Sequence, residues 1–271
     1  MGGDEKKMRF LEKKLKNEKS TFTIPKSVQD VIPIKTIYGD GIFYLDKNKF
    51  SKCYKFTDTN YTAEDKEVQE SIFFNYSGLI NSFESGTENK INIINRRINE
   101  VEFANAMLIS SAKDKLDIFR DEINKILISD ANRNGVVQEK FITTTIDKHN
   151  VQDARTYFSR VGAEFANHFA TLDSKCIELD CKERMRIFHD FYRTGNETEY
   201  RFDIKESMRK GHSFKDFICP TTFEFKSDYF KMDNRYGRVL FLKEYASYIK
   251  DSMIAELTDL PKNLMLSIDV I

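Results

Sequence analysis

The sequence of 271 residues contains no tryptophan and only four prolines, and it lacks any long apolar run. A membrane-spanning helix needs about 20 consecutive, mostly apolar residues, whereas the apolar stretch at 239–242 has only the length of a strand. The first 20 residues also lack the apolar segment of a secretory signal peptide. We therefore expect a cytoplasmic protein without a transmembrane segment, which reaches a membrane only through a partner or a surface contact.

The sequence has no excess of charge of either sign. It contains 43 basic and 43 acidic residues, so its formal net charge is zero. A strong overall attraction to nucleic acid is therefore not expected, and any binding to it should be weak and sensitive to salt. Hydrophobic residues make up 40% of the chain, including 23 phenylalanines and 12 tyrosines, which is enough for an aromatic core.

Phosphate-binding loops are also missing. ATP hydrolysis by a P-loop requires the pattern G-x-x-x-x-G-K-[ST], which places amides, a lysine and a hydroxyl on the phosphates. Residues 210–213 (KGHS) have the wrong order, and residues 39–41 (GDG) lack the third glycine of a dinucleotide site, so both favour structural turns. We predict that this chain has no catalytic or cofactor-binding residues and neither binds nor hydrolyses ATP.

The four cysteines do not form a metal-binding pattern. Cys176 and Cys181 are separated by four residues, and His189 and His212 follow without a second close pair, so the spacing predicts no zinc site. In a chain without a signal peptide, we expect all four thiols to be reduced. His189 lies between aromatic residues on a predicted helix, which favours a packed histidine. A cysteine–histidine catalytic pair would require proximity that the sequence does not establish.

Short basic clusters leave one alternative open. They are Arg96–Arg97, Arg184 with Arg186, and Arg209–Lys210. Such clusters can contact phosphates, and a continuous basic face would favour a nucleic-acid-binding module. Acidic residues are interleaved throughout, however, so we interpret the clusters as solvated surfaces.

The pattern of apolar residues predicts an α+β fold with mixed or antiparallel sheets, packed helices and a β-β-α-β unit at each end. We predict strands at 35–45, 50–57, 91–94, 136–146, 176–179, 222–231, 238–243 and 264–270. We predict helices at 66–83, 114–128, 151–172, 181–192 and 244–257, with one or two short helices within 203–219. Asn150 is expected to cap the third of these helices, and Asp180 with Glu183 approximates a capping box for the fourth.

These elements divide into three parts. Residues 1–22 are dense in charge and are expected to be a flexible N-terminal segment, with contact to anionic lipid or a partner as the alternative. Residues 23–220 are predicted to form the main α+β domain. Residues 221–271 are predicted to begin a second β-β-α-β subdomain. Because the sequence stops within an alternating strand, we expect this subdomain to be truncated and to have an uncovered edge.

Several longer strings resemble one family. They are 23–33 (TIPKSVQDVIP), 40–45 (DGIFYL), 52–61 (KCYKFTDTNY), 186–193 (RIFHDFYR), 208–220 (MRKGHSFKDFICP), 236–246 (YGRVLFLKEYA) and 265–271 (MLSIDVI). In this order they resemble the N-terminal region of the conjugation ATPases of Gram-positive conjugative transposons. These ATPases belong to the TraE/TrsE/TrbE/CagE class of type IV secretion ATPases, and the resemblance extends from about residue 21 to the end.

The resemblance implies a non-catalytic docking and assembly domain of a protein that powers DNA transfer. Its ATP and magnesium sites would lie in a RecA-like C-terminal domain, and no residue here matches those motifs. The implied partners are other secretion components at the inner face of the cytoplasmic membrane, the protein's own ATPase domain and further copies of itself. The implied location is cytoplasmic and peripheral to the membrane.

Overall fold

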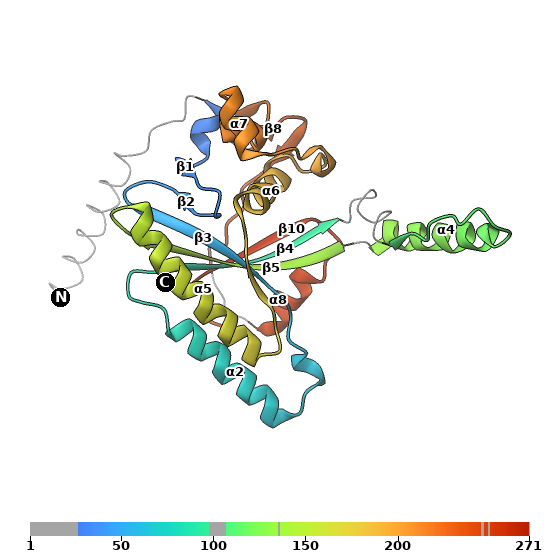
Figure 1. Ribbon diagram of the computed structural model, residues 1–271, viewed down its shortest axis with the longest axis horizontal. Helices are drawn as coiled ribbons and strands as arrows, with labels where there is room; N and C mark the ends of the chain where they lie inside the picture. Colours follow the sequence, from blue (N-terminus) through green and yellow to red (C-terminus); the bar gives the residue numbers. More distant parts are fainter. Residues whose placement is uncertain (1–26, 98–106, 135, 245–246, 249, 271) are drawn as a thin grey trace.

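The computed structural model describes residues 27–97, 107–134, 136–244, 247–248 and 250–270. Within them, an antiparallel sheet of seven strands has the order β1-β2-β3-β5-β4-β10, and β6 pairs with β3 (Figure 1). The strands are β1 (Thr36–Ile37), β2 (Phe43–Tyr44), β3 (Lys49–Phe56), β4 (Glu88–Arg97), β5 (Val136–Asp147), β6 (Cys176–Glu178) and β10 (Leu264–Val270).

Helices pack against both faces of this sheet, which confirms the predicted α+β class. The helices are α2 (Lys66–Asn81), α4 (Asp117–Asn134), α5 (Val151–Thr171), α6 (Cys181–Tyr192), α7 (Ile204–Lys210) and α8 (Asp251–Thr258). Short 3-10 turns are η1 (Val28–Val31), η2 (Tyr61–Ala63), η3 (Glu197–Glu199) and η4 (Phe214–Phe217). A separate small sheet contains β7 (Phe223–Phe225), β8 (Phe230–Met232) and β9 (Arg235–Gly237).

The larger core lies between the sheet and helices α5 and α2. Asn150 caps α5 as predicted, because its side chain accepts a hydrogen bond of 2.9 Å from the amide of Asp153. The helix then directs its apolar residues onto the sheet, and Phe158 and Phe165 are 0% and 1% exposed. The hydroxyl of Tyr54 on β3 donates to the carbonyl of Phe158 at 3.2 Å, which satisfies a buried polar group.

The opposite face of the sheet carries α6 and a second core. Asp180 and Glu183 form the predicted capping box at the start of α6. Around Met185 on this helix, buried residues from the N-terminal strands and from the region of α7 and η4 form a separate cluster. Its buried members are Ile32, Ile34, Phe43, Cys181, Met185, Phe202, Ile218 and Cys219.

The turn at residues 39–41 joins the two layers. Gly41 has a φ of +79°, and a Cβ atom at this position would collide with the carbonyl of Leu179, just before α6. Glycine is therefore required both by the backbone angle and by the close approach of the two segments. This agrees with the structural interpretation of the GDG sequence.

The last strand departs from the predicted domain boundary. β10 pairs antiparallel with β4 along its whole length, from Leu264 opposite Asn95 to Val270 opposite Asn89. The described part of 221–271 therefore does not form an independent β-β-α-β unit, because its final strand belongs to the main sheet. The apolar alternation of β10 correctly predicted a strand, but alternation does not specify which strand it pairs with.

Other corrections concern the region before β10. Residues 222–231 form two short strands with a turn instead of one strand, and a contact between Thr222 and Asp233 closes the hairpin. Residues 238–243 form no strand, and the helix expected from residue 244 begins only at Asp251. Residues 1–22, for which a flexible charged segment was predicted, lie outside the described residues, as does Ile271.

Candidate functional site

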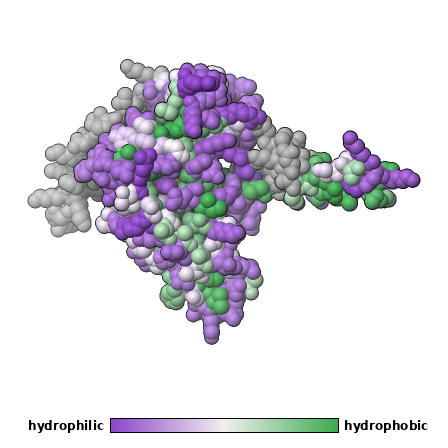
Figure 2. Space-filling view, in the orientation of Figure 1, coloured by the Kyte–Doolittle hydropathy of each residue, from purple (hydrophilic) through white to green (hydrophobic). Residues whose placement is uncertain are grey.

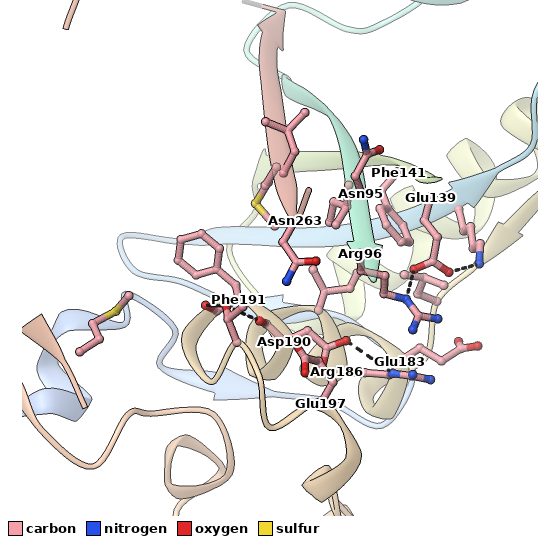
Figure 3. Close-up of a pocket in the computed structure, with 18 of the residues that line it drawn as sticks. Asn95, Arg96, Glu139, Phe141, Glu183, Arg186, Asp190, Phe191, Glu197 and Asn263 are labelled. Carbon is pink, nitrogen blue, oxygen red and sulfur yellow. Dashed lines mark hydrogen bonds and ion pairs between the residues drawn. The ribbon is translucent and has the colours of Figure 1, made fainter. Parts of the chain in front are cut away.

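A cleft of about 540 Å³ lies between α6 and the face of the main sheet opposite α5 (Figure 3). Its floor includes Ile94 and Phe141 from β4 and β5, and its walls include Ile187 and Phe191 from α6. Met232, Arg235 and Met265 add side chains from the small sheet and β10. The cleft thus collects residues from segments that are far apart in the sequence.

The charged groups of the cleft are paired across neighbouring strands. Glu139 on β5 contacts Lys55 on β3 at 2.5 Å and Arg96 on β4 at 3.1 Å. Burial opposes the ionisation of Glu139, but the hydrogen bond from Lys55 and the charge of Arg96 outweigh it, so its pKa is lowered. On α6, Arg186 lies 3.7 Å from Asp190. The cleft is therefore a balanced, amphipathic surface.

The composition of the cleft suits binding better than acid–base or nucleophilic chemistry. Its lining contains no histidine or cysteine, and one of its half-buried carboxylates, Glu139, is held ionised between two bases. A general acid or base usually needs a pKa near the working pH, and a nucleophile needs an adjacent base. The pKa of Glu139 is instead lowered away from that range by its two basic neighbours.

The cysteines and histidines considered from the sequence lie in different places. Cys176 packs against the larger core, whereas Cys181 and His189 are buried around α6, and His212 is exposed after α7. Burial raises the pKa of both Cys176 and Cys181 to about 12, so neither thiol is a thiolate at neutral pH. Across the described chain, no three His, Cys, Asp or Glu residues are grouped as metal ligands.

His189 is a packed helix histidine, as the sequence favoured. Its Nδ1 lies 3.2 Å from a carboxylate oxygen of Asp190, and its ring centroid is 5.1 Å from that of Tyr200. The three aromatic and polar groups hold the end of α6 against the segment before α7. The geometry thus gives His189 two packing partners, Asp190 and Tyr200.

The basic clusters do not combine into one face in the described part of the chain. Arg184, interpreted as solvated, is instead 4% exposed. It donates to the carbonyls of Gly41 and Ser51, both at 2.7 Å, and its guanidinium lies 3.9 Å above the ring of Phe43. Arg96 points into the cleft, and the side chain of Arg97 lies outside the described residues. Lys210 pairs with Glu206 on α7 at 2.6 Å.

The most exposed apolar helix is α4, between β4 and β5. Figure 1 shows it projecting away from the sheet, and Figure 2 shows hydrophobic residues gathered along it. The residues whose spacing predicted a helix include Phe119, Ile123 and Ile126, which are 61%, 45% and 58% exposed. We call residues 107–134 the α4 arm. The spacing of its apolar residues predicted a helix, but this spacing alone did not show that the apolar face is uncovered.

The α4 arm is stabilised mainly by its own polar contacts. The side-chain nitrogen of Asn124 donates to the carbonyl of Ile109 at 2.9 Å, and its side-chain oxygen accepts from the backbone amide of Ile109 at the same distance. Asp117 accepts hydrogen bonds from Ser111 at 2.6 Å and from the amide of Ala112 at 3.1 Å. These contacts fold residues 107–116 against the helix while leaving its apolar face accessible to a partner.

Compared with models of protein families and with curated proteins, the sequence matches none. None of the helices in the described residues is both long and apolar enough to span a membrane.

Proposed function

We propose that this chain is a docking and assembly module of a conjugative type IV secretion ATPase, and that it carries no catalytic step itself. The proposal rests on the ordered strings that resemble the N-terminal region of these ATPases. It places the module in the cytoplasm at the inner face of the membrane. ATP and magnesium would bind to a separate ATPase domain.

The observation that carries a docking function is the exposed apolar face of the α4 arm. Contiguous exposed apolar surface is typical of protein interaction sites, since such surface is unfavourable in water. Phe119, Ile123 and Ile126 recur at helical spacing, which is the pattern that an amphipathic helix presents to a complementary groove. Basic and acidic residues are equal in number along 107–134, so a protein surface fits the arm better than an anionic membrane.

The partner in this proposal is a protein component of the secretion apparatus. Photo-crosslinking tests the contact directly in donor cells that carry the conjugative element. A photoreactive residue in place of Ile126, which is 58% exposed on the apolar face of the arm, should form a crosslink to an identified secretion component. The same residue in place of Lys210, at the exposed end of α7, should not.

A transfer assay with a charge-matched pair of variants tests whether the contact matters. Phe119→Glu with Ile123→Glu places two negative charges on the apolar face and should lower transfer frequency by tenfold or more, about 1.4 kcal/mol or more of lost binding. Lys125→Glu changes the net charge equally on the opposite side and should leave transfer nearly unchanged. Equal transfer by both variants, with both proteins folded and present at normal levels, would contradict the proposal.

A further inference from the structure

Four consecutive apolar side chains are exposed in the segment that connects β9 to α8. Val239, Leu240, Phe241 and Leu242 are 76%, 82%, 84% and 70% exposed. In Figure 1 this connection leads from the small sheet beside α7 to α8 on the opposite side of the main sheet. Residues 238–242 have no regular secondary structure. An apolar run this exposed is unfavourable in water unless something covers it.

The residues around this run are basic and aromatic. Exposed Arg238 and Lys243 flank it directly, and exposed Glu244 follows Lys243. Tyr236 and Tyr248, on either side, are 72% and 67% exposed. Tyrosine favours the boundary between water and lipid, while arginine and lysine extend their charge toward anionic headgroups.

We propose that residues 238–243 form a loop that inserts into an anionic phospholipid surface. Val239–Leu242 would enter the edge of the acyl region, with Arg238 and Lys243 on the headgroups. This proposal specifies how the module would contact the membrane, and it rests on the membrane location in the proposed function.

The pattern of exposure favours lipid over a protein surface. Neighbouring side chains along a chain point in different directions, so a flat protein face or the edge of a second copy would cover only part of four consecutive residues. Acyl chains surround an inserted loop on all sides. The two basic residues directly beside the run, Arg238 and Lys243, also match an anionic surface.

The absence of tryptophan makes a site-specific test possible. In the full chain, Phe241→Trp introduces a single tryptophan into the loop, and Phe73→Trp places one on α2, where Phe73 is also exposed. With vesicles of phosphatidylcholine and phosphatidylglycerol, the emission of the loop tryptophan should shift to shorter wavelength and be quenched by brominated acyl chains. The α2 tryptophan should show neither effect.

Vesicle co-sedimentation with matched variants measures the contribution of the loop. Leu240→Ser with Phe241→Ser should reduce partitioning into anionic vesicles by about tenfold or more. Phe73→Ser with Phe74→Ser removes two similarly exposed apolar residues and should leave partitioning unchanged. The charged N-terminal segment is present in every variant, so binding through it would affect both pairs equally. Arg238→Gln with Lys243→Gln should cost about fivefold per charge on anionic vesicles and little on neutral ones.

Three results would overturn the inference. They are an unchanged emission of the loop tryptophan with vesicles, equal partitioning of the two serine pairs, and a concentration-dependent shift without lipid, which would indicate a second copy as the occupant. Because these measurements use the isolated chain and lipid alone, their failure leaves the crosslinking and transfer tests of the α4 arm unaffected. Failure of the lipid tests and failure of the α4 arm tests can therefore be told apart.

Discussion

Helices α4 and α5 flank the same strand, β5, and both have apolar residues at helical spacing, yet they have opposite environments. Phe158 and Phe165 on α5 are fully buried against the sheet, whereas Phe119 and Ile126 on α4 are more than half exposed. The difference arises from the connections. Asn150 caps α5 three residues after β5 ends, so the helix returns across the sheet, while α4 lies within the long connection between β4 and β5.

The comparison shows that the apolar face of an amphipathic helix can have two different roles. On α5 the apolar face stabilises the fold, because it removes aromatic side chains from water within the chain itself. On α4 the same kind of face contributes little to the fold, so its apolar residues are explained better by contact with another molecule. Substitutions in the two helices should therefore affect different measurements.

The largest difference is expected between phenylalanines in the two helices. Phe158→Ala should lower the free energy of unfolding by about 3–5 kcal/mol, because it leaves a cavity in the larger core. Phe119→Ala on the α4 arm should change it by less than about 0.5 kcal/mol, because the side chain is already exposed to water. Urea unfolding followed by far-UV circular dichroism measures both, and similar losses would show that the arm is packed against the body in solution.

Sequence patterns predicted the main sheet and the helices packed on it well, because the local conformational preferences of these residues agree with their long-range packing. Strands β3, β5 and β10 and helices α2, α5 and α6 lie close to their predicted positions, and the caps at Asn150 and Asp180 form as expected. The predicted boundary at residue 221 did not capture the pairing of β10 with β4, since pairing depends on contacts between distant segments. The run at 239–242 has strand-like composition but no partner strand among the described residues.

The next largest difference in stability loss is expected between two arginine-to-alanine variants. Arg184→Ala should destabilise the protein by about 2–3 kcal/mol, because the buried carbonyls of Gly41 and Ser51 lose their donor. Arg120→Ala removes half-buried ion pairs with Asp114 and Asp117 that lie within the α4 arm, and it should leave the global unfolding midpoint unchanged. Equal midpoints for the two variants would show that Arg184 is not the buried link between the layers.

Neither the cleft nor the role of Arg184 followed from sequence patterns. Arg184 is close to Arg186 in the sequence, and both were interpreted as part of one solvated cluster. On α6 the two side chains have different environments, because Arg184 is buried beneath the turn containing Gly41 while Arg186 lines the cleft. The cleft itself combines β3, β4, β5, α6 and β9, so its residues meet only through the tertiary fold.

A smaller, pH-dependent difference is expected for acidic residues. The pKa of Glu139 is lowered in the folded protein, so its contribution is present above the unfolded pKa of about 4.3 and is lost as pH falls through the folded pKa. Glu139→Gln should destabilise the protein by about 1–2 kcal/mol near neutral pH, with the difference shrinking below about pH 4. Glu122→Gln on the exposed side of α4 is the control and should show no such trend. A constant difference for Glu139→Gln across this range, in urea titrations at several pH values, would contradict the ion-pair explanation.

The smallest effect on global stability is expected at Asp117, which organises the α4 arm. The hydrogen bond from Ser111 and the contacts with Arg120 and Ala112 lower its pKa to about 2, so these contacts persist at neutral pH and are lost only as pH falls through that value. Asp117→Asn should weaken them and increase amide exchange several-fold in 107–125, because the arm opens locally without unfolding the sheet. Exchange in α5 and β5 and the global unfolding midpoint should stay unchanged. Hydrogen exchange with peptide-level mass spectrometry distinguishes the cases: faster exchange in α5 as well would mean that arm and body unfold as one unit.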